Sequence, residues 1–148
     1  MRVHQRDLLT RRWRNVLEPP SEAAFHIQLV SILRWAIRPN VLWWHTPNGG
    51  YRNAREAAKL KAMGTLPGVS DLQFHWVEID KLHRRIRHVL HLELKAKNGL
   101  SSEAQASFAL AVKLLGDDYE IARSVDDALG ILRACGLLRN DVRIEHSL

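Results

Sequence analysis

A chain of 148 residues, 46% hydrophobic and 26% charged, is long enough for one domain with a buried core and too short for two. No segment approaches the roughly 18 uninterrupted apolar residues of a membrane span, and the N-terminus lacks the apolar stretch of a secretory signal. These features exclude a membrane protein, so we expect a soluble protein of the cytoplasm.

Positive charge is concentrated in the first part of the chain. The formal net charge is +6, and residues 1–61 hold 11 Lys and Arg against 4 Asp and Glu, whereas residues 116–148 hold 4 against 7. Because polyphosphate backbones attract Lys and Arg through counterion release, nucleic acid is the first partner to consider. The plainer alternative is a basic soluble protein without a polyanionic partner.

The chain begins with a basic arm, residues 1–20, which ends at two prolines. Residues 21–37 are then predicted to form a helix capped by Ser21 and stopped by Pro39. With about 100° between successive residues, the apolar side chains form one stripe, and Glu22 lies at the head of it. The stripe consists of Phe25, Leu29, Ile32, Leu33 and Ala36. A carboxylate therefore points toward the core side of this helix.

A strand is predicted over residues 41–46, followed by a turn over residues 47–50. A strand cannot direct Trp43 and Trp44 to the same side. We therefore expect one of them in the core and the other at an interface or stacked on a base.

The turn leads into an Ala-rich basic helix, predicted over residues 52–63 and closed by Gly64. Bare backbone N–H groups in the turn, beside two arginines, can cradle a phosphate. The residues concerned are Asn48, Gly49, Gly50, Arg52 and Arg55. The alternative is a plain tight turn.

Residues 71–79 and 85–95 are predicted to form an antiparallel hairpin joined by a short connection. If the chain turns at Leu82, residues whose numbers sum to 164 face each other, which sets Asp71 opposite Glu93. The same register places Leu72, Phe74, Trp76, Leu90 and Leu92 on one face, and Asp71, Gln73, Glu93 and Lys95 on the other. The hydrophobic pattern favours this register, because a slip by one residue would bury Glu93 on the apolar side.

Three arginines, Arg84, Arg85 and Arg87, lie at the predicted tip of the hairpin. They can form a solvated basic loop or a contact for DNA.

Beyond the hairpin, a helix over residues 102–115 opens with a capping box of Ser102 and Gln105. A strand over residues 119–124 and a helix over residues 126–138 follow, with Cys135 as a core filler. This order predicts an α/β fold, a mixed sheet with helices on both sides.

Asp71 and Glu93 are carboxylates held opposite each other, an arrangement most readily retained when a divalent cation neutralises it. Hard oxygen ligands favour Mg²⁺ or Mn²⁺. A histidine or thiolate site is less favoured, since there is one cysteine and the eight histidines lack paired zinc spacing. Such a cation can lower the pKa of a bound water, and Lys95 can orient that water or neutralise developing charge.

The chain resembles the VRR-NUC branch of the PD-(D/E)XK nucleases over about residues 21–134. The resemblance rests on Glu22, "NGG" at 48–50, "GVSD" at 68–71, "ELK" at 93–95 and Gln105 at the start of its helix. In the usual "GxPD" motif this chain has Ser70 in place of proline, which affects the stiffness of the loop more than its chemistry.

The resemblance implies a restriction-endonuclease-like core over residues 21–148 and metal-dependent hydrolysis of DNA phosphodiester bonds. It further implies a homodimer that resolves four-way junctions or other branched DNA. The catalytic set would be Glu22, Asp71, Glu93, Lys95 and Gln105, with the metal at Asp71, Glu93 and the Leu94 carbonyl. Nucleic acid would meet Asn48, Gly49, Gly50, Arg52, Arg55 and Lys97.

Each of these residues also has a structural alternative. Glu22 can be a favourable acid in the first turn of a helix, and Asp71 an ordinary turn residue. Glu93 and Lys95 can be a surface ion pair, and Gln105 can do no more than close the capping box. The corresponding alternatives for function are a nucleic-acid-binding module that does not cut, and a nicking or restriction-type nuclease without junction preference.

Overall fold

The computed structural model describes residues 19–47 and 53–141. At its centre is a four-stranded sheet in the order β1 (Leu42–His45), β2 (Leu72–Ile79), β3 (Arg85–Leu94) and β4 (Asp118–Ala122). β2 is antiparallel to both β1 and β3, and β4 lies parallel to β3. A parallel neighbour requires a crossover connection, and α4 (Glu103–Leu114) provides it.

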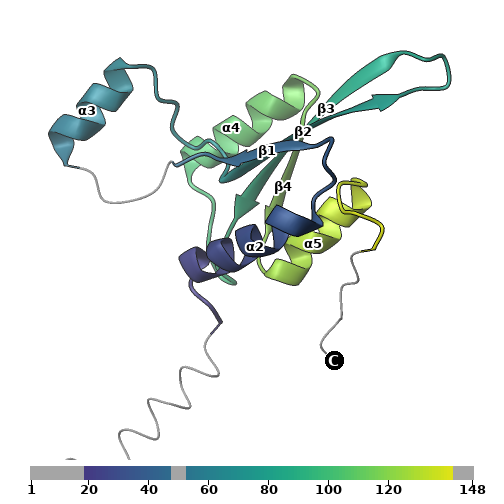
Figure 1. The fold of residues 1–148 in the computed structure, drawn as a ribbon. Coiled ribbons are helices and arrows are strands. Elements are labelled where there is room, and N and C mark those ends of the chain that lie inside the picture. The colour runs from purple at the N-terminus through teal and green to yellow at the C-terminus, as the bar shows by residue number, and fades with distance from the viewer. Residues whose placement is uncertain (1–18, 48–52, 142–148) are drawn as a thin grey trace, which may run out of the picture.

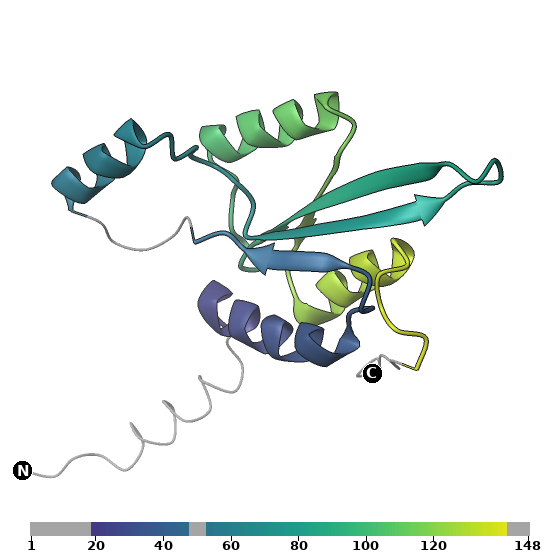
Figure 2. The same cartoon turned by 45° about the horizontal axis from the view of Figure 1, so that its top comes forward.

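Helices cover both faces of this sheet. Figures 1 and 2 show α2 (Glu22–Ala36) and α5 (Val125–Ala134) side by side on one face and α4 on the other. The predicted α/β fold, a mixed sheet flanked by helices, is confirmed. None of the helices in the described ranges is long and apolar enough to cross a membrane.

The main core lies between the sheet and the pair α2 and α5. The stripe predicted for α2 packs into it, with Phe25, Leu29, Leu33 and Ala36 buried and Ile32 partly buried. These side chains meet the apolar face of β2 and β3, which contributes Leu72, Phe74, Trp76, Leu90, Leu92 and Leu94. At the far end of α5, Cys135 packs against the same core, as predicted.

The hairpin has the predicted register, since Leu72 pairs with Leu92 and Phe74 with Leu90. Its connection is fixed by Asp80, whose side chain accepts hydrogen bonds from the backbone N–H groups of Leu82 and Arg84. The hairpin extends well beyond β1 and β4 (Figures 1 and 2).

The last helix is shorter than predicted. The expectation of a helix over residues 126–138 is wrong, because α5 ends at Ala134 and Gly136 adopts the left-handed conformation with φ +71°. The chain that follows returns to the core, where Leu138 pairs with Ile37 in an isolated antiparallel bridge.

Helix α3 (Ala54–Ala62) begins later than the predicted residue 52, because Asn53 caps it by accepting a hydrogen bond from the Glu56 N–H. It contains no buried residue and stands apart from the sheet in both ribbon views (Figures 1 and 2). Residues 48–50 of the turn predicted over 47–50 lie outside the described residues, as does Arg52.

Candidate active site

Glu93, near the end of β3, is the one buried carboxylate among the described residues, with 2% of its surface exposed. Its Oε1 accepts a hydrogen bond from Lys95 Nζ at 2.9 Å and another from the side-chain amide of Gln105. Its Oε2 is buried and has no hydrogen-bond partner in the described part of the chain. Burial raises the pKa of Glu93, and the nearby charges of Asp71 and Glu22 raise it further, against the opposing effect of Lys95. A buried oxygen without a donor is a natural position for a cation.

Lys95 directly follows β3, and its backbone N–H donates to the Ala122 carbonyl at 3.0 Å. The alternative of a surface ion pair is wrong, because Lys95 is 7% exposed and Glu93 is 2% exposed. An ammonium group has three N–H donors, of which one points to Glu93. The remaining donors suit a water molecule or a phosphate oxygen.

Asp71 lies one residue before β2, at the ends of three strands. Its Oδ2 accepts a hydrogen bond from the Leu94 N–H at 2.8 Å, and its backbone carbonyl accepts from the Thr46 N–H at 2.9 Å. Because Leu72 pairs with Leu92, this position lies next to Glu93 along the hairpin. Asp71 is thus fixed by backbone contacts to both neighbouring strands, which is more than an isolated turn residue needs.

Glu22 is the first residue of α2 and is exposed to solvent. Its Oε2 accepts a hydrogen bond from the Ala96 N–H at 3.2 Å, so it links the start of α2 to the loop after Lys95. Its position in the first turn also suits the helix dipole. The structural alternative for Glu22 therefore fits, and its contact with the loop after Lys95 places it beside the candidate site.

Gln105 closes the predicted capping box and also contacts Glu93. Its side-chain oxygen accepts from the Ser102 N–H at 2.9 Å, which closes the capping box, while its amide nitrogen donates to Glu93. The start of α4 lies against Gly68, where a Cβ would be 2.3 Å from the Ala104 carbonyl oxygen. The glycine of the "GVSD" segment is therefore required by close approach of the two backbones.

A buried network behind Asp71 was not anticipated from the sequence. Ser70 is fully buried, and its Oγ lies 3.4 Å from His91 Nδ1, while His91 Nε2 lies 3.2 Å from Asp117 Oδ2. The order Ser, His, Asp resembles that of a hydrolytic triad, but a hydroxyl with no exposed surface cannot attack a substrate. The network instead supports the loop that carries Asp71, at the position where the resembled motif has a proline.

Arg123, just after β4, is a second contributor that the sequence did not reveal. Its guanidinium donates to the carbonyls of Gly99 at 2.8 Å, Ala96 at 3.0 Å and Lys97 at 3.4 Å. One side chain thus holds the loop that follows Lys95.

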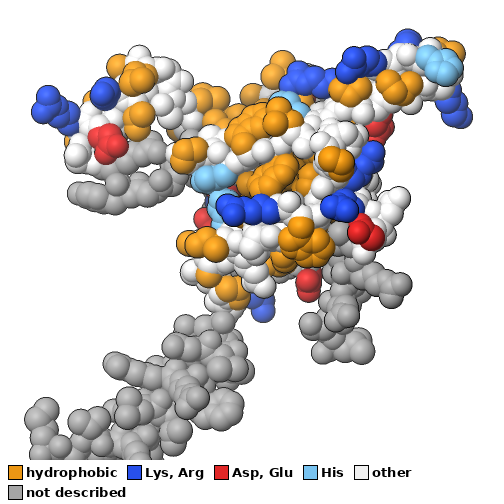
Figure 3. Space-filling model, in the orientation of Figure 1, with side chains coloured by type: hydrophobic (Ala, Val, Ile, Leu, Met, Phe, Trp, Pro, Cys, Tyr) orange, Lys and Arg blue, Asp and Glu red, His pale blue; other side chains and the backbone are white. Residues whose placement is uncertain are grey.

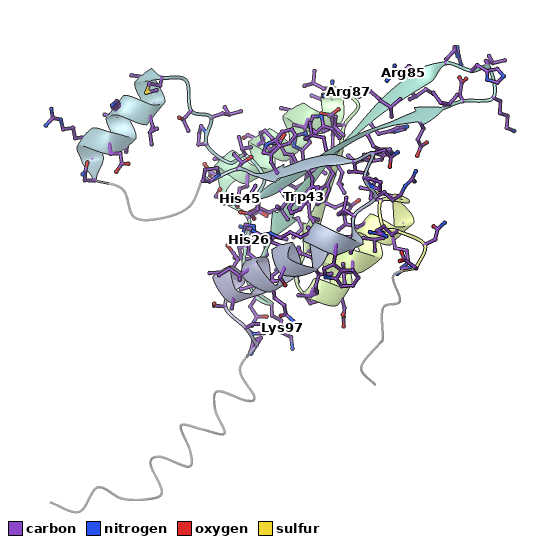
Figure 4. The ribbon with its side chains drawn as sticks, viewed as in Figure 1. His26, Trp43, His45, Arg85, Arg87 and Lys97 are labelled. Carbon is purple, nitrogen blue, oxygen red and sulfur yellow. The ribbon has the colours of Figure 1, made fainter. Side chains whose placement is uncertain are left out.

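Two histidines at the edge of the site were also missed. His45 Nδ1 lies 2.8 Å from the Asp71 carbonyl oxygen, which can only accept, so Nδ1 carries the hydrogen. The ring of His26, one turn after Glu22 on α2, meets that of His45 edge to face at 4.5 Å (Figure 4). Burial lowers the pKa of His26, and the neighbouring His45 lowers it further. The sequence signal for His26 was its spacing of four residues from Glu22, which places both side chains on the same face of the helix. His45 had no comparable signal.

Of the predicted nucleic-acid contacts, Arg55 and Lys97 lie among the described residues. Asn48, Gly49, Gly50 and Arg52 lie outside the described residues, and Arg55 is exposed on α3. Lys97 is exposed in the loop after β3, on the side of the molecule where α2 begins (Figure 4).

The donor set fits a hard cation held largely by water. No group of three or more His, Cys, Asp or Glu side chains within the described ranges is arranged to hold a metal ion. Mg²⁺ commonly binds through only one or two carboxylates and keeps several waters. The free Oε2 of Glu93, with Asp71 close enough to raise its pKa, matches that requirement.

Comparison with known proteins supports the fold. No family model matches the sequence, and comparison with curated proteins gives no match. A solved structure described as a VRR_NUC domain protein superposes with a TM-score of 0.59 at 19% sequence identity, covering 80% of this chain and 89% of that chain. The chain therefore has a VRR_NUC-like fold.

Proposed function

We propose that this protein is a metal-dependent endonuclease that hydrolyses DNA phosphodiester bonds. The observation that carries the proposal is the buried Glu93 carboxylate, which is bound at Oε1 by Lys95 and Gln105 and whose Oε2 has no hydrogen-bond partner among the residues that the structure describes. An unpaired buried carboxylate oxygen is costly in a stable fold unless a ligand compensates for it. The likeness to a VRR_NUC domain protein supports the same class of reaction.

Mg²⁺ or Mn²⁺ would be held by Asp71, Glu93 and the Leu94 carbonyl. Bound there, the cation would lower the pKa of a coordinated water and offset negative charge on the phosphate. Gln105 and Lys95 together fix the orientation of the Glu93 carboxylate.

The remaining residues position the catalytic groups. The N–H donors of Lys95 that do not contact Glu93 would hold the attacking water or a phosphate oxygen as charge develops. Glu22 and Arg123 both hold the loop after Lys95, through the Ala96 N–H and the Ala96 carbonyl respectively. A group held by several backbone contacts loses less entropy when the substrate binds.

Branched DNA, in particular the four-way junction, is our proposed substrate, and a homodimer is the proposed active form. Both rest on the family resemblance. Two copies of the site would allow paired cuts on opposing strands.

The test is cleavage of four-way junctions, nicked duplex and linear duplex by the purified full chain, with Mg²⁺, Mn²⁺ or EDTA. We expect metal-dependent products that are lost in Asp71→Asn and in Glu93→Gln, whose side chains keep the size of the originals. Asp126→Asn, an exposed first-turn acid of α5, is the matched control and should cut normally. Unchanged cutting by Asp71→Asn would refute the assignment.

Metal binding can be measured without cleavage. A ligand at about 100 times its Kd stabilises the folded state by about 2.7 kcal/mol, so Mn²⁺ should raise the Tm of the wild type. We expect that increase to disappear in Glu93→Gln. Salt-sensitive binding of DNA with neither effect would instead favour a non-catalytic nucleic-acid-binding module.

A further inference from the structure

One face of the hairpin, together with β1, carries an aromatic and basic surface outside the candidate active site. Because side chains alternate along strands, Trp44 shares a face with His75 and Arg87, whereas Trp43 and Phe74 stack on the core side, 6.1 Å apart. We call Trp44, His75, Arg85 and Arg87 the hairpin platform. Of the two neighbouring tryptophans, Trp44 therefore faces outward and Trp43 faces the core.

The platform is held together by ring and guanidinium contacts. Trp44 stacks on His75 with ring centroids 4.7 Å apart and an interplanar angle of 29°. Arg87 Nη2 donates to His75 Nδ1 at 3.1 Å, which leaves the hydrogen on Nε2 of the neutral ring. Burial lowers the pKa of His75, and Arg87 lowers it further, so the imidazole stays neutral and can accept this bond.

The charge of the platform is uncompensated. Within the described ranges, neither Arg85 nor Arg87 forms an ion pair with a carboxylate. Both contribute to a pocket of about 470 Å³ between β1 and the hairpin, whose lining includes Asn40, Leu42, His75 and Val77 and no acidic residue. Figure 3 shows Lys and Arg side chains following the hairpin, and Figure 4 shows Arg85 and Arg87 in succession along it.

The platform lies along the same strand as the candidate active site. His75 is four residues after Asp71, which corresponds to about 13 Å at about 3.3 Å per residue. Gln73 lies between them and donates to the Thr46 hydroxyl at 3.1 Å.

A polyanion that contains bases fits this surface better than a second copy of the chain. Leu42, Trp44 and Val77 are exposed and would suit an apolar contact. However, a twofold contact through the platform would bring the arginines of two copies together without any acid to offset them. Aromatic rings beside Arg are the usual surface for unpaired nucleotides, since every base can stack and every phosphate is anionic.

We propose that the hairpin platform binds an unpaired nucleotide of a branched DNA substrate that carries a single-stranded arm, near the candidate active site. Its base stacks on Trp44, and the phosphates of the same strand contact Arg87 and then Arg85, which follow each other toward the tip of the hairpin. This inference rests on the proposed nuclease function and adds a source of selectivity, because a base within a duplex is not free to stack on protein. Substrates with unpaired nucleotides near the cut would be preferred over continuous duplex.

The test measures binding by fluorescence anisotropy in EDTA, with labelled duplex, single strand, and duplex carrying a single-stranded flap. Stacking on an aromatic residue contributes about 1–3 kcal/mol per base, so Trp44→Ala should weaken binding of the flap and the single strand by about fivefold or more. Binding of continuous duplex should change little. Trp44→Phe should restore most of the affinity.

Two further variants provide the comparison. Trp35, which is 57% exposed on α2 compared with 38% for Trp44, gives the matched control Trp35→Ala, which should bind as the wild type does. Arg87→Ala should lower the slope of log K against log salt concentration by about 0.7 for a single strand. Lys113→Ala on α4 controls for the loss of charge and should leave the slope nearly unchanged.

The platform and the nuclease proposal can fail separately. If Trp44→Ala weakens flap binding but no metal-dependent cleavage is found, the binding surface stands and the nuclease assignment falls. If the wild type cuts DNA but Trp44→Ala binds the flap no worse than Trp35→Ala does, the platform proposal is overturned. Dissociation of a dimer by Trp44→Ala, without a change in flap affinity, would show that the surface is covered by a second copy.

Discussion

Gln105 joins the first turn of α4 to the buried carboxylate of Glu93. Its side-chain oxygen accepts the hydrogen bond that completes the capping box with Ser102, and its side-chain nitrogen donates to Glu93 Oε1. Because the oxygen and the nitrogen of the amide are both engaged, the orientation of the Gln105 side chain is fixed. Gln105 therefore contacts Glu93 at Oε1, and Oε2 has no partner among the described residues.

This dual role predicts different results for the two residues of the capping box. Gln105→Ala removes a hydrogen bond to a buried charged group and should lower stability by about 1–3 kcal/mol, with at least a tenfold loss of the proposed cleavage activity. Ser102→Ala removes only the cap, which is worth about 1 kcal/mol, and should leave cleavage almost intact. Urea denaturation and initial cleavage rates would measure both. Equal losses of activity would show that Gln105 acts only as a cap.

Tyr119 on β4 should report the charge of the site. Burial raises the pKa of Tyr119 to about 12, with Glu93 and then Asp71 as further causes. An unfolded tyrosine ionises near about pH 10, so the unfolded chain releases its proton first and stability should fall as the pH rises from about 10 to 12. Below about pH 10 the phenol makes no pH-dependent contribution.

The same pKa offers a test of the proximity of Glu93. In a Tyr51→Phe background, which leaves Tyr119 as the one tyrosine, phenolate absorbance would give its pKa directly. Glu93→Gln should lower that pKa, while burial keeps it above about 10. Circular dichroism at each pH would confirm that the chain is still folded. An unchanged pKa in Glu93→Gln would contradict the electrostatic contact.

The local and hairpin features could be predicted from the sequence because their signals are short in range. Apolar residues occupy every second position, Leu72 and Phe74 on one strand and Leu90 and Leu92 on the other, and this pattern determined the register. The register in turn placed Asp71 beside Glu93. The parallel pairing of β3 with β4 depends on contacts across the α4 crossover, which no periodicity records.

That non-local pairing explains which site residues were missed. His91 and Asp117 are 26 residues apart, and they meet only because β4 lies beside β3. Arg123 reaches the loop after Lys95 for the same reason. In contrast, Gly136 in "ACGLL" was a visible end signal for α5, and the predicted helix passed over it.

The network behind Asp71 predicts a positioning role for His91. His91→Phe would keep the edge-to-face contact with Phe108 at 5.3 Å but would leave Asp117 and Ser70 without the imidazole. We expect a stability loss of about 1–3 kcal/mol and a lower kcat with little change in KM, because the Asp71 loop is less well held. His88→Phe is the control, since His88 stacks on Trp76 on the hairpin, away from Asp71. If His91→Phe loses stability but keeps a normal kcat, the network contributes to folding and not to the position of Asp71 during catalysis.

Gly68 gives the most direct test of how the Asp71 loop packs on α4. It has φ +81°, and an added Cβ would lie 2.4 Å from the Ala104 carbonyl carbon and 2.7 Å from the Gln105 nitrogen, both of them backbone atoms. Gly68→Ala should therefore incur both the left-handed strain and the overpacking, together about 2–5 kcal/mol. The displaced α4 would also carry Gln105 away from Glu93, so metal-induced stabilisation should weaken as well.

Gly64→Ala separates the two costs. Gly64 has φ +87°, but a Cβ added there would have nothing within 4 Å, so the substitution carries only the backbone strain of about 1–2 kcal/mol. Comparing the two variants by urea denaturation gives the cost of the close approach alone. If Gly68→Ala costs no more than Gly64→Ala, α4 can move away without penalty. The contact of Gln105 with Glu93 would then be too loosely held to orient a catalytic carboxylate.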